Sequence, residues 1–135
     1  MLKRLAAIAV FLALAACHGS SSPTDPAASL PHGRLSGTVT IGPNCPGPTT
    51  TAGCPTPPDA YAQRKILVYD AAKTKLINTV DIDSQGLYTI LLLPGMYTID
   101  LKRVGIDHTG DLPATVTIQA NGTTVLNVNI DTGIR

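Results

Sequence analysis

The sequence contains no glutamate and no tryptophan, and it has a single phenylalanine among its 135 residues. All nine acidic residues are aspartates, and the chain has ten basic residues, which gives a net charge of +1. This balance leaves no basic stripe of the kind that holds phosphates, so no nucleic acid is expected as a partner. Histidine is also scarce, with three copies, which leaves few groups for acid–base catalysis.

Glycine and proline, in contrast, are frequent, with 12 and 11 copies, and β-branched residues are plentiful. This mixture favours turns and strands over helices. The length suggests one domain. Removal of an export signal and a tether would leave roughly a hundred residues, which can bury a single core without metal or many disulfides.

The amino terminus is typical of a secretory signal. Lys3 and Arg4 are followed by ten apolar residues, Leu5 to Leu14, and then by Ala15 and Ala16. The apolar run is too short to span a bilayer comfortably. Cleavage after residue 16 would remove both cations and leave eight basic against nine acidic residues.

The stretch Leu14-Ala15-Ala16-Cys17 resembles the lipobox of bacterial lipoproteins. The resemblance implies that residues 1–16 are a signal peptide, that Cys17 carries a lipid with palmitate among its acyl chains, and that this lipid holds the protein on a membrane. In double-membrane bacteria an aspartate after the lipidated cysteine often retains the protein at the inner membrane. His18 stands there instead, so the resemblance implies a cell-envelope location, at the outer membrane if the cell has one. An ordinary signal peptide with an incidental cysteine is the alternative.

Residues 18–34 lack periodicity and are rich in Ser, Pro, Ala and Gly. Together with Cys17 they are interpreted as a flexible tether over 17–34, with an average span of roughly 20–25 Å. His18 and His32 lie in this tether. Their spacing fits no metal-ligand motif, so no metal site is expected there.

From Leu35 onward the apolar residues recur with period two. Seven strands are predicted, over 35–41, 64–70, 75–83, 86–93, 96–103, 114–119 and 123–131. Strands at this spacing predict an all-β sandwich in which each sheet packs one face. The predicted core consists of Val39, Ile66, Val68, Val80, Ile82, Tyr88, Ile90, Leu92, Tyr97, Ile99, Leu101, Val116, Ile118, Leu126 and Val128.

The residues between these strands carry turn signals. The stretch Asp83 to Gly86 fits a type I turn, and Leu93-Pro94-Gly95-Met96 fits a type II turn. Asn121-Gly122 is the strongest short hairpin signal in the chain.

The segment Asp81 to Tyr88, followed by Leu93 to Ile99, resembles the core of carboxypeptidase regulatory-like domains. Those domains commonly show a D-x-x-G-x-Y/F turn and then L-x-P-G-x-Y. The resemblance implies a seven-stranded transthyretin-like (prealbumin-like) Greek-key sandwich over residues 35–135. The motif is shared with collagen-adhesin B-type repeats, so the subfamily stays open, and the motif names no ligand.

The three cysteines are an odd number, and lipidation of Cys17 leaves Cys45 and Cys54. Exported proteins enter an oxidising compartment, so a disulfide between these two is expected. It would close a ten-residue loop, which the chain-entropy model values at roughly 2.5–3 kcal/mol. Two free thiols are the alternative.

The segment Gly42 to Gln63 around this pair is long for a compact sandwich and rich in proline. Its G-P-x-C-P…C-x-x-P arrangement resembles one in other envelope lipoproteins with the same domain. Long loops of this kind are usually functional or disordered. Two interpretations of this segment stay open, a recognition loop and a purely structural loop. The candidate binding residues are Asn44, Pro46, Pro48, Pro55, Pro57 and Pro58.

The stretch Asp107 to Asp111, with His108 between them, is the only cluster of catalytic residue types. Asp107, His108 and Asp111 could ligate a metal, but nothing supplies a second histidine or an activated nucleophile. We therefore expect a solvated loop and no metal or other cofactor. Enzymes of related fold carry motifs, such as a terminal Y-R-G-S or paired Tyr and His ligands, that are missing here.

A Lys–Asn isopeptide bond, as in some adhesin domains, would join Lys65 or Lys75 to Asn127 or Asn129. It would need a buried Asp or Glu beside it, and by alternation the asparagines face outward.

These features together predict a non-catalytic lipoprotein anchored in the envelope. Its β-sandwich would bind a protein or glycan of the envelope, or act as a structural spacer. The alternative is an enzyme or metal-binding protein that uses the loop Asp107–Asp111.

Overall fold

The computed structural model of the chain describes residues 30–46 and 54–134. The predicted signal peptide, Cys17, most of the tether and Pro48 lie outside these residues. Within the described ranges, no helix is long and apolar enough to cross a membrane.

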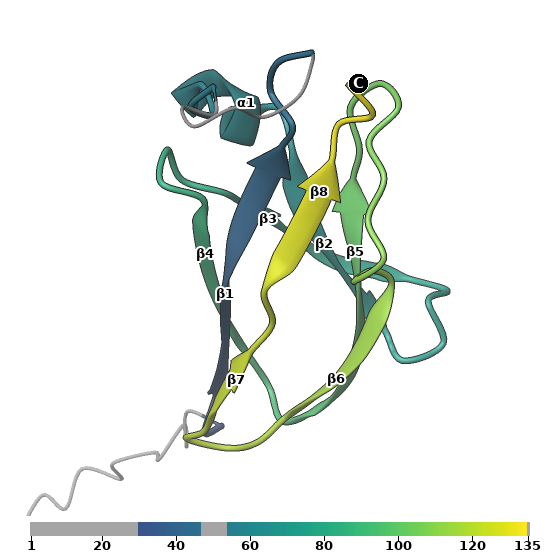
Figure 1. Ribbon diagram of the computed structural model, residues 1–135. Helices are drawn as coiled ribbons and strands as arrows, with labels where there is room; N and C mark the ends of the chain where they lie inside the picture. The colour runs from purple at the N-terminus through teal and green to yellow at the C-terminus, as the bar shows by residue number, and fades with distance from the viewer. Residues whose placement is uncertain (1–29, 47–53, 135) are drawn as a thin grey trace, which may run out of the picture.

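The described residues form a sandwich of two four-stranded sheets and one short helix (Figure 1). In one sheet β1 is central, with β4 on one side and both β7 and β8 on the other; the second sheet has the order β3-β2-β5-β6. The predicted all-β sandwich is confirmed, with eight strands in the described part rather than seven. The bounds are β1 Gly33–Gly42, α1 Pro58–Ala62, β2 Lys65–Asp70, β3 Leu76–Asp81, β4 Leu87–Leu92, β5 Gly95–Lys102, β6 Ala114–Ile118, β7 Thr123–Val125 and β8 Val128–Asp131.

The core lies between the sheets and follows the predicted alternation. Eleven of the fifteen predicted core residues are buried, and Ile90, Tyr97, Val116 and Leu126 are only partly buried. Three of these four lie on strands or connections at sheet edges, where an inward side chain has a neighbour on one side only. Tyr97 keeps its hydroxyl at the surface, where it donates to the Leu93 carbonyl at 2.8 Å. The core also contains five residues outside the predicted set: Leu35, Ile41, Tyr61, Leu112 and Ile130.

The predicted last strand is broken in two. β7 pairs in parallel with residues 34–36 of β1, and β8 pairs in parallel with residues 39–42. Between them the side chain of Asn127 replaces a backbone partner, because its Oδ1 accepts a hydrogen bond from the Thr38 N–H at 3.0 Å. The kink between β7 and β8 therefore leaves the Thr38 amide satisfied.

Gly37 makes this kink possible. A Cβ at this position would lie 1.8 Å from the Leu126 carbonyl oxygen and 2.8 Å from the ring of Tyr88. The Tyr88 hydroxyl donates to the same Leu126 carbonyl at 2.5 Å. Burial raises the pKa of Tyr88 to about 12, so the hydroxyl keeps its proton and remains a donor at neutral pH.

Two of the predicted turns differ from expectation. The turn at Asp83 to Gly86 forms, with a 3.0 Å hydrogen bond from Gly86 N–H to the Asp83 carbonyl. Asn121 also turns the chain, with φ of 59°, but the turn joins β6 and β7 of different sheets because β7 pairs with β1 instead. It is therefore not a hairpin. Gly95 already belongs to β5 and has φ of 156°, which is not the value of about +80° in a type II turn.

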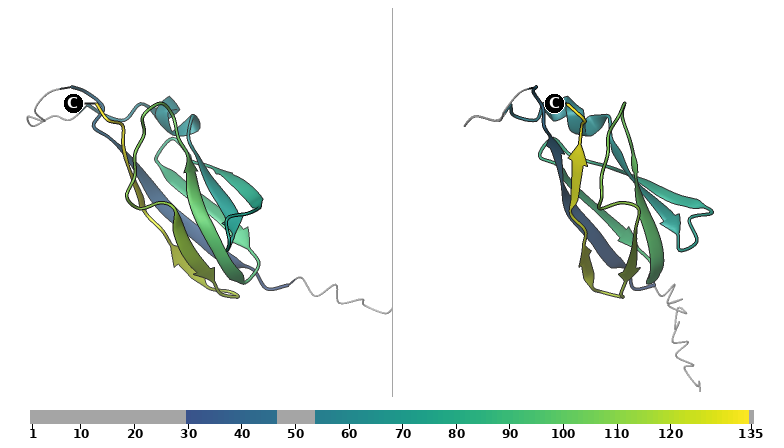
Figure 2. Two further views of the ribbon diagram at one scale, coloured as in Figure 1. Left: turned by 90° about the vertical axis from the view of Figure 1, so that its right-hand side faces the viewer. Right: turned by 45° about the vertical axis from the view of Figure 1, so that its right-hand side comes forward.

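The sandwich has two distinct ends, which the views in Figure 2 display. At the end called here the tether end, Asn121 N–H donates to the His32 carbonyl at 2.9 Å, close to where β1 begins. β1 then runs about 30 Å, the length expected of its ten residues, to the opposite end. This distal end holds α1, the end of β8 and the C terminus (Figure 1).

Candidate binding surface at the distal end

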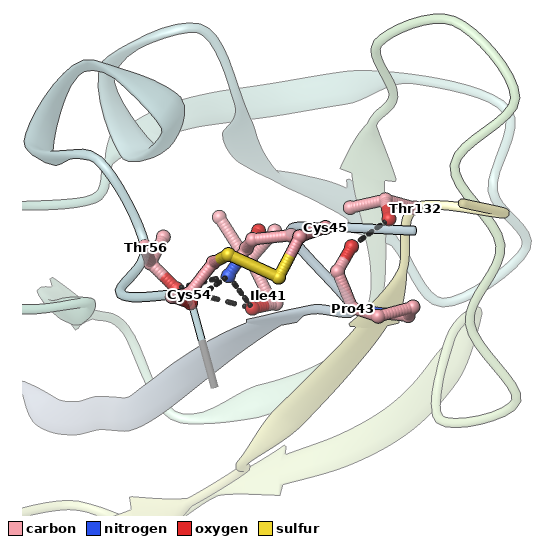
Figure 3. The surroundings of a disulfide bond; sticks show 7 residues. Ile41, Pro43, Cys45, Cys54, Thr56 and Thr132 are labelled. Atoms are coloured by element: carbon pink, nitrogen blue, oxygen red, sulfur yellow. Dashed lines mark hydrogen bonds between the residues drawn. A yellow bond between two sulfur atoms is a disulfide. The ribbon is translucent and has the colours of Figure 1, made fainter. Parts of the chain in front are cut away.

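Cys45 and Cys54 form a disulfide at the distal end, with their Cα atoms 5.9 Å apart (Figure 3). This is the pairing predicted from the sequence. The described parts of the loop lie beside the end of β8, where the Thr132 hydroxyl donates to the Pro43 carbonyl and Thr132 N–H donates to the Gly42 carbonyl at 3.1 Å. The start of the loop is thus bonded to the residue that follows β8.

Asn44 has an internal role in this loop. Its Nδ2 donates to the carbonyls of Ile41 at 3.0 Å and Cys54 at 3.3 Å, and to the Thr56 hydroxyl oxygen at 2.9 Å. Thr56 in turn donates to the Ile41 carbonyl at 3.1 Å. The amide nitrogen of this candidate binding residue therefore clips the two arms of the loop together and is not free to donate to a ligand.

The remaining candidate residues of the loop are prolines. Pro46, Pro55, Pro57 and Pro58 are all exposed, and Pro48 lies outside the described residues. Proline fixes its own φ, so these residues present apolar surface with little conformational freedom to lose.

The helix α1 was not predicted and follows directly from this loop. Pro58 is its first residue and Asp59 lies in its first turn, which are favourable positions for proline and for a negative charge. Tyr61 is the buried residue of the helix, and its ring packs against Gly86, where a Cβ would lie 2.9 Å from it. The pair Pro58-Asp59 is the sequence feature from which the start of this helix could have been predicted.

A buried ion pair ties this helix to the connection between β5 and β6. Arg64 Nε donates to Asp107 Oδ2 at 2.6 Å, and its Nη2 donates to Oδ1 at 2.8 Å, while Nη1 donates to the Ala60 carbonyl at 2.7 Å. Burial alone would raise the pKa of Asp107, but the hydrogen bonds from Arg64 and the Val104 N–H outweigh it and hold that pKa below its ordinary value.

The prediction of a solvated loop at Asp107 to Asp111 is wrong for two of its residues. Asp107 and Thr109 are both buried, at 6% exposure. Arg64 does not begin the predicted strand over 64–70 either, since it lies between the end of α1 and the start of β2 at Lys65. It supplies the counter-charge that makes burial of Asp107 possible. The pair is 43 residues apart in sequence, so no local pattern could reveal it.

The three candidate metal ligands of this loop point to different partners. Asp107 is paired with Arg64, and Asp111 Oδ2 accepts the Asn129 N–H at 2.7 Å. His108 pairs through its backbone with Asp131, and its side chain is exposed. Over residues 30–46 and 54–134, no three such side chains meet in a group that could hold a metal ion.

Of the isopeptide partners considered from the sequence, Lys65 and Asn129 lie on strands of different sheets, and Lys75 and Asn127 lie outside the strands. Lys65, on β2, forms an ion pair with Asp81. Asn129, on β8, accepts a hydrogen bond from the Thr40 hydroxyl at 3.2 Å.

Apolar side chains complete the exposed distal end. Ile106 is 75% exposed and Ile134 is 38% exposed. A Cβ on Gly133 would lie 2.6 Å from Ile106 Cδ1, so the side chain of Ile106 packs directly against Gly133. We define the distal surface as the exposed residues Pro46, Pro55, Pro57, Pro58, Ile106 and Ile134.

The fold is similar to that of GBS52, the minor pilin of the Gram-positive pathogen Streptococcus agalactiae, with a TM-score of 0.53 and 15% sequence identity. The match covers 76% of this chain and 45% of GBS52, so the chain spans less than half the length of that protein. A DUF3823 family protein from Parabacteroides merdae matches at a TM-score of 0.44 and 22% identity, over 74% of this chain and 46% of the other. At these identities the likeness concerns the fold alone. No protein-family model and no curated protein matches the sequence.

Proposed function

We propose that this chain is a lipid-anchored protein of the cell envelope whose β-sandwich is a non-catalytic binding module. In this proposal Cys17 carries the lipid and the distal surface meets an envelope protein. The observation that supports it is the arrangement of the two ends: the described chain enters at the tether end, and the exposed prolines of the disulfide loop lie at the other, together with Ile106 and Ile134.

The distal surface suits recognition because it is both apolar and held in place. The disulfide, the Asn44 clip and the Arg64–Asp107 pair join its segments to one another. Preorganised loops lose little entropy on binding, and rigid scaffolds commonly present their binding loops in this way. The exposed apolar groups of this surface favour a protein partner.

The anchor is tested by Cys17→Ser in the producing cell. We expect the variant to leave the membrane fraction, because it would keep the export signal and lose the lipid. Persistence in carbonate-washed membranes of a variant from which residues 1–16 have been cleaved would refute the anchor.

The distal surface is tested by photo-crosslinking from single positions in intact envelopes. Probes at Pro55 and Ile106 should capture a partner, whereas a probe at Ile77, an exposed isoleucine on β3, should not. Ile106→Asp should weaken capture and Ile77→Asp should not. Equal capture from all three positions would argue against a specific distal surface, and no capture from any of them would favour a spacer.

A further inference from the structure

A cleft of about 670 Å³ lies on the outer face of the sheet formed by β4, β1 and β7, away from the distal surface. Two rows of side chains that cross the sheet form its floor. One row contains Thr89, Ser36 and Val125, which are register partners on the three strands. The next row contains Leu87 and Thr38, with Asn127 following on the far side.

The concavity follows from the sizes of these side chains. β1, the central strand, contributes the short side chains of Ser36 and Thr38, with Gly37 between them. The strands on either side contribute the exposed apolar side chains of Leu87 and Val125, at 46% and 64% exposure. A trough with a hydroxyl-bearing floor and apolar walls results.

The kink between β7 and β8 adds an oriented amide to this trough. Asn127 Oδ1 is held by the Thr38 N–H at 3.0 Å. Its Nδ2 has no protein partner within the described residues, so it remains available as a donor. The hydroxyls of Thr38 and Thr89 are likewise unbonded within that part of the chain and can both donate and accept.

The central strand of the floor offers no backbone groups to a ligand. β1 is hydrogen-bonded to β4 on one side and to β7 and β8 on the other, so its N–H and C=O groups are occupied. An extended peptide pairs with free backbone groups at a sheet edge, and the central strand, which lies under the trough, is no edge. The floor is too polar for an acyl chain. The charges lining the cleft are one guanidinium, Arg34, and two carboxylates, of which Asp81 is paired with Lys65, so no excess charge suits a polyanion.

We propose that this cleft binds a neutral carbohydrate chain. Sugar hydroxyls donate and accept at once and so match the hydroxyls of Thr38 and Thr89 and the amide of Asn127, while the C–H faces of pyranose rings pack on Leu87 and Val125. The cleft has the volume of a typical small-ligand site. This inference gives the binding module a second ligand and does not depend on the distal surface.

The experiment is a titration of the isotopically labelled full-length chain in detergent, followed by NMR amide shifts. The probes are maltotetraose, cellotetraose and the tetramer of N-acetylglucosamine, each raised to about 10 mM, which detects weak binding. We expect at least one of them to shift the amides of Ser36, Thr38 and Thr89 in a saturable manner. The double variant Thr38→Val with Thr89→Val keeps the side-chain shape and removes two hydroxyls, so affinity should fall about tenfold.

The matched control is Thr115→Val with Thr117→Val, which makes the same change at exposed positions of β6 in the other sheet. It should bind like the unaltered chain. The proposal is wrong if none of the three probes shifts the cleft amides, if the Thr38 and Thr89 variant binds with unchanged affinity, or if the shifts fall only on the distal loops. The last result would leave the proposed distal surface intact.

Discussion

At the tether end of the sandwich, the connections are short, and the turn between β6 and β7 is closed by the backbone. Gly122 N–H donates to the Gln119 carbonyl at 3.1 Å, and Arg34 N–H donates to the Gly122 carbonyl at 2.8 Å. β4 and β5 are separated by two residues only. Side chains add single neutral hydrogen bonds, from the Tyr97 hydroxyl to the Leu93 carbonyl and from the Thr124 hydroxyl to the Thr117 carbonyl.

At the distal end, longer connections are joined by side chains. A disulfide links Cys45 to Cys54, the Asn44 amide bonds across the same loop, and Arg64 pairs with Asp107 over 43 residues of sequence. Longer loops cost more entropy to order. Order at the distal end therefore rests on a few specific side chains, and substitutions can test each of them.

The largest effect is expected from breaking the buried ion pair. Arg64→Ala would leave the Asp107 carboxylate buried without a counter-charge, which should lower the free energy of unfolding by about 3–5 kcal/mol. Urea unfolding at pH 7 measures this loss. The control is Arg64→Met with Asp107→Leu, which should cost much less than Arg64→Ala because no charge stays buried. A loss below about 1 kcal/mol for Arg64→Ala would place the pair among weak surface interactions.

The same pair predicts a pH dependence. The pKa of Asp107 is lower in the folded chain than in the unfolded chain, despite burial, because Arg64 and the Val104 N–H bond to the charged form. Its stabilisation is therefore fully present above the unfolded value, about pH 4, and is lost as the pH falls through the lower folded pKa. The difference in unfolding free energy between the unaltered chain and Asp107→Asn should stay constant from neutral pH down to that range and shrink below it.

A smaller effect is expected from removing the disulfide. Cys45→Ser with Cys54→Ser reopens a loop of about ten residues, and the chain-entropy model gives a loss of roughly 2.5–3 kcal/mol. Denaturant midpoints of the two forms, together with their m-values, provide the measurement. Either single serine variant should match the double variant. An unchanged midpoint would mean that the Asn44 clip and the contacts of Thr132 order the loop without the covalent link.

The strands of the sandwich were predictable because their signal is local. Ile66 and Val68 on β2, and Ile99 and Leu101 on β5, alternate with outward residues and are all buried. The split of the last strand was not predictable. It depends on the close contact of Gly37 with the Leu126 carbonyl, and these residues are far apart in sequence. A glycine in a predicted strand does not indicate which residue will contact it.

At the distal surface, too, some features were predictable from the sequence and others were not. The pairing of Cys45 with Cys54 was predictable from the cysteine count and from the expected export, and the exposure of the prolines was predictable from their place in a loop. The role of Asn44 did not follow, because asparagine in a loop suits a ligand contact and an internal clip equally well. The burial of Asp107 depends on a distant arginine, which only the folded chain brings near.

A still smaller loss of unfolding free energy is expected from Asn44→Ala. It removes the donor of the clip and should cost about 1–2 kcal/mol, because the two amide hydrogens, which are shared among three acceptors, lose their neutral hydrogen bonds. The loss should shrink in the serine variant that lacks the disulfide, since both interactions order the same loop. Unfolding free energies of the four combinations measure this coupling. Strictly additive losses would show that the clip and the disulfide act independently.

The smallest effect is expected at the tether end, from Asn121→Ala. Asn121 adopts φ of 59°, a conformation that costs alanine about 1 kcal/mol more than asparagine or glycine. Its contact with the sandwich is made by its backbone N–H, which donates to the His32 carbonyl and survives the substitution. Asn121→Gly, the control, should therefore change the free energy of unfolding by less than about 0.5 kcal/mol. If Asn121→Ala instead lowers stability as much as loss of the disulfide, this end depends on side chains too, and the contrast between the two ends does not hold.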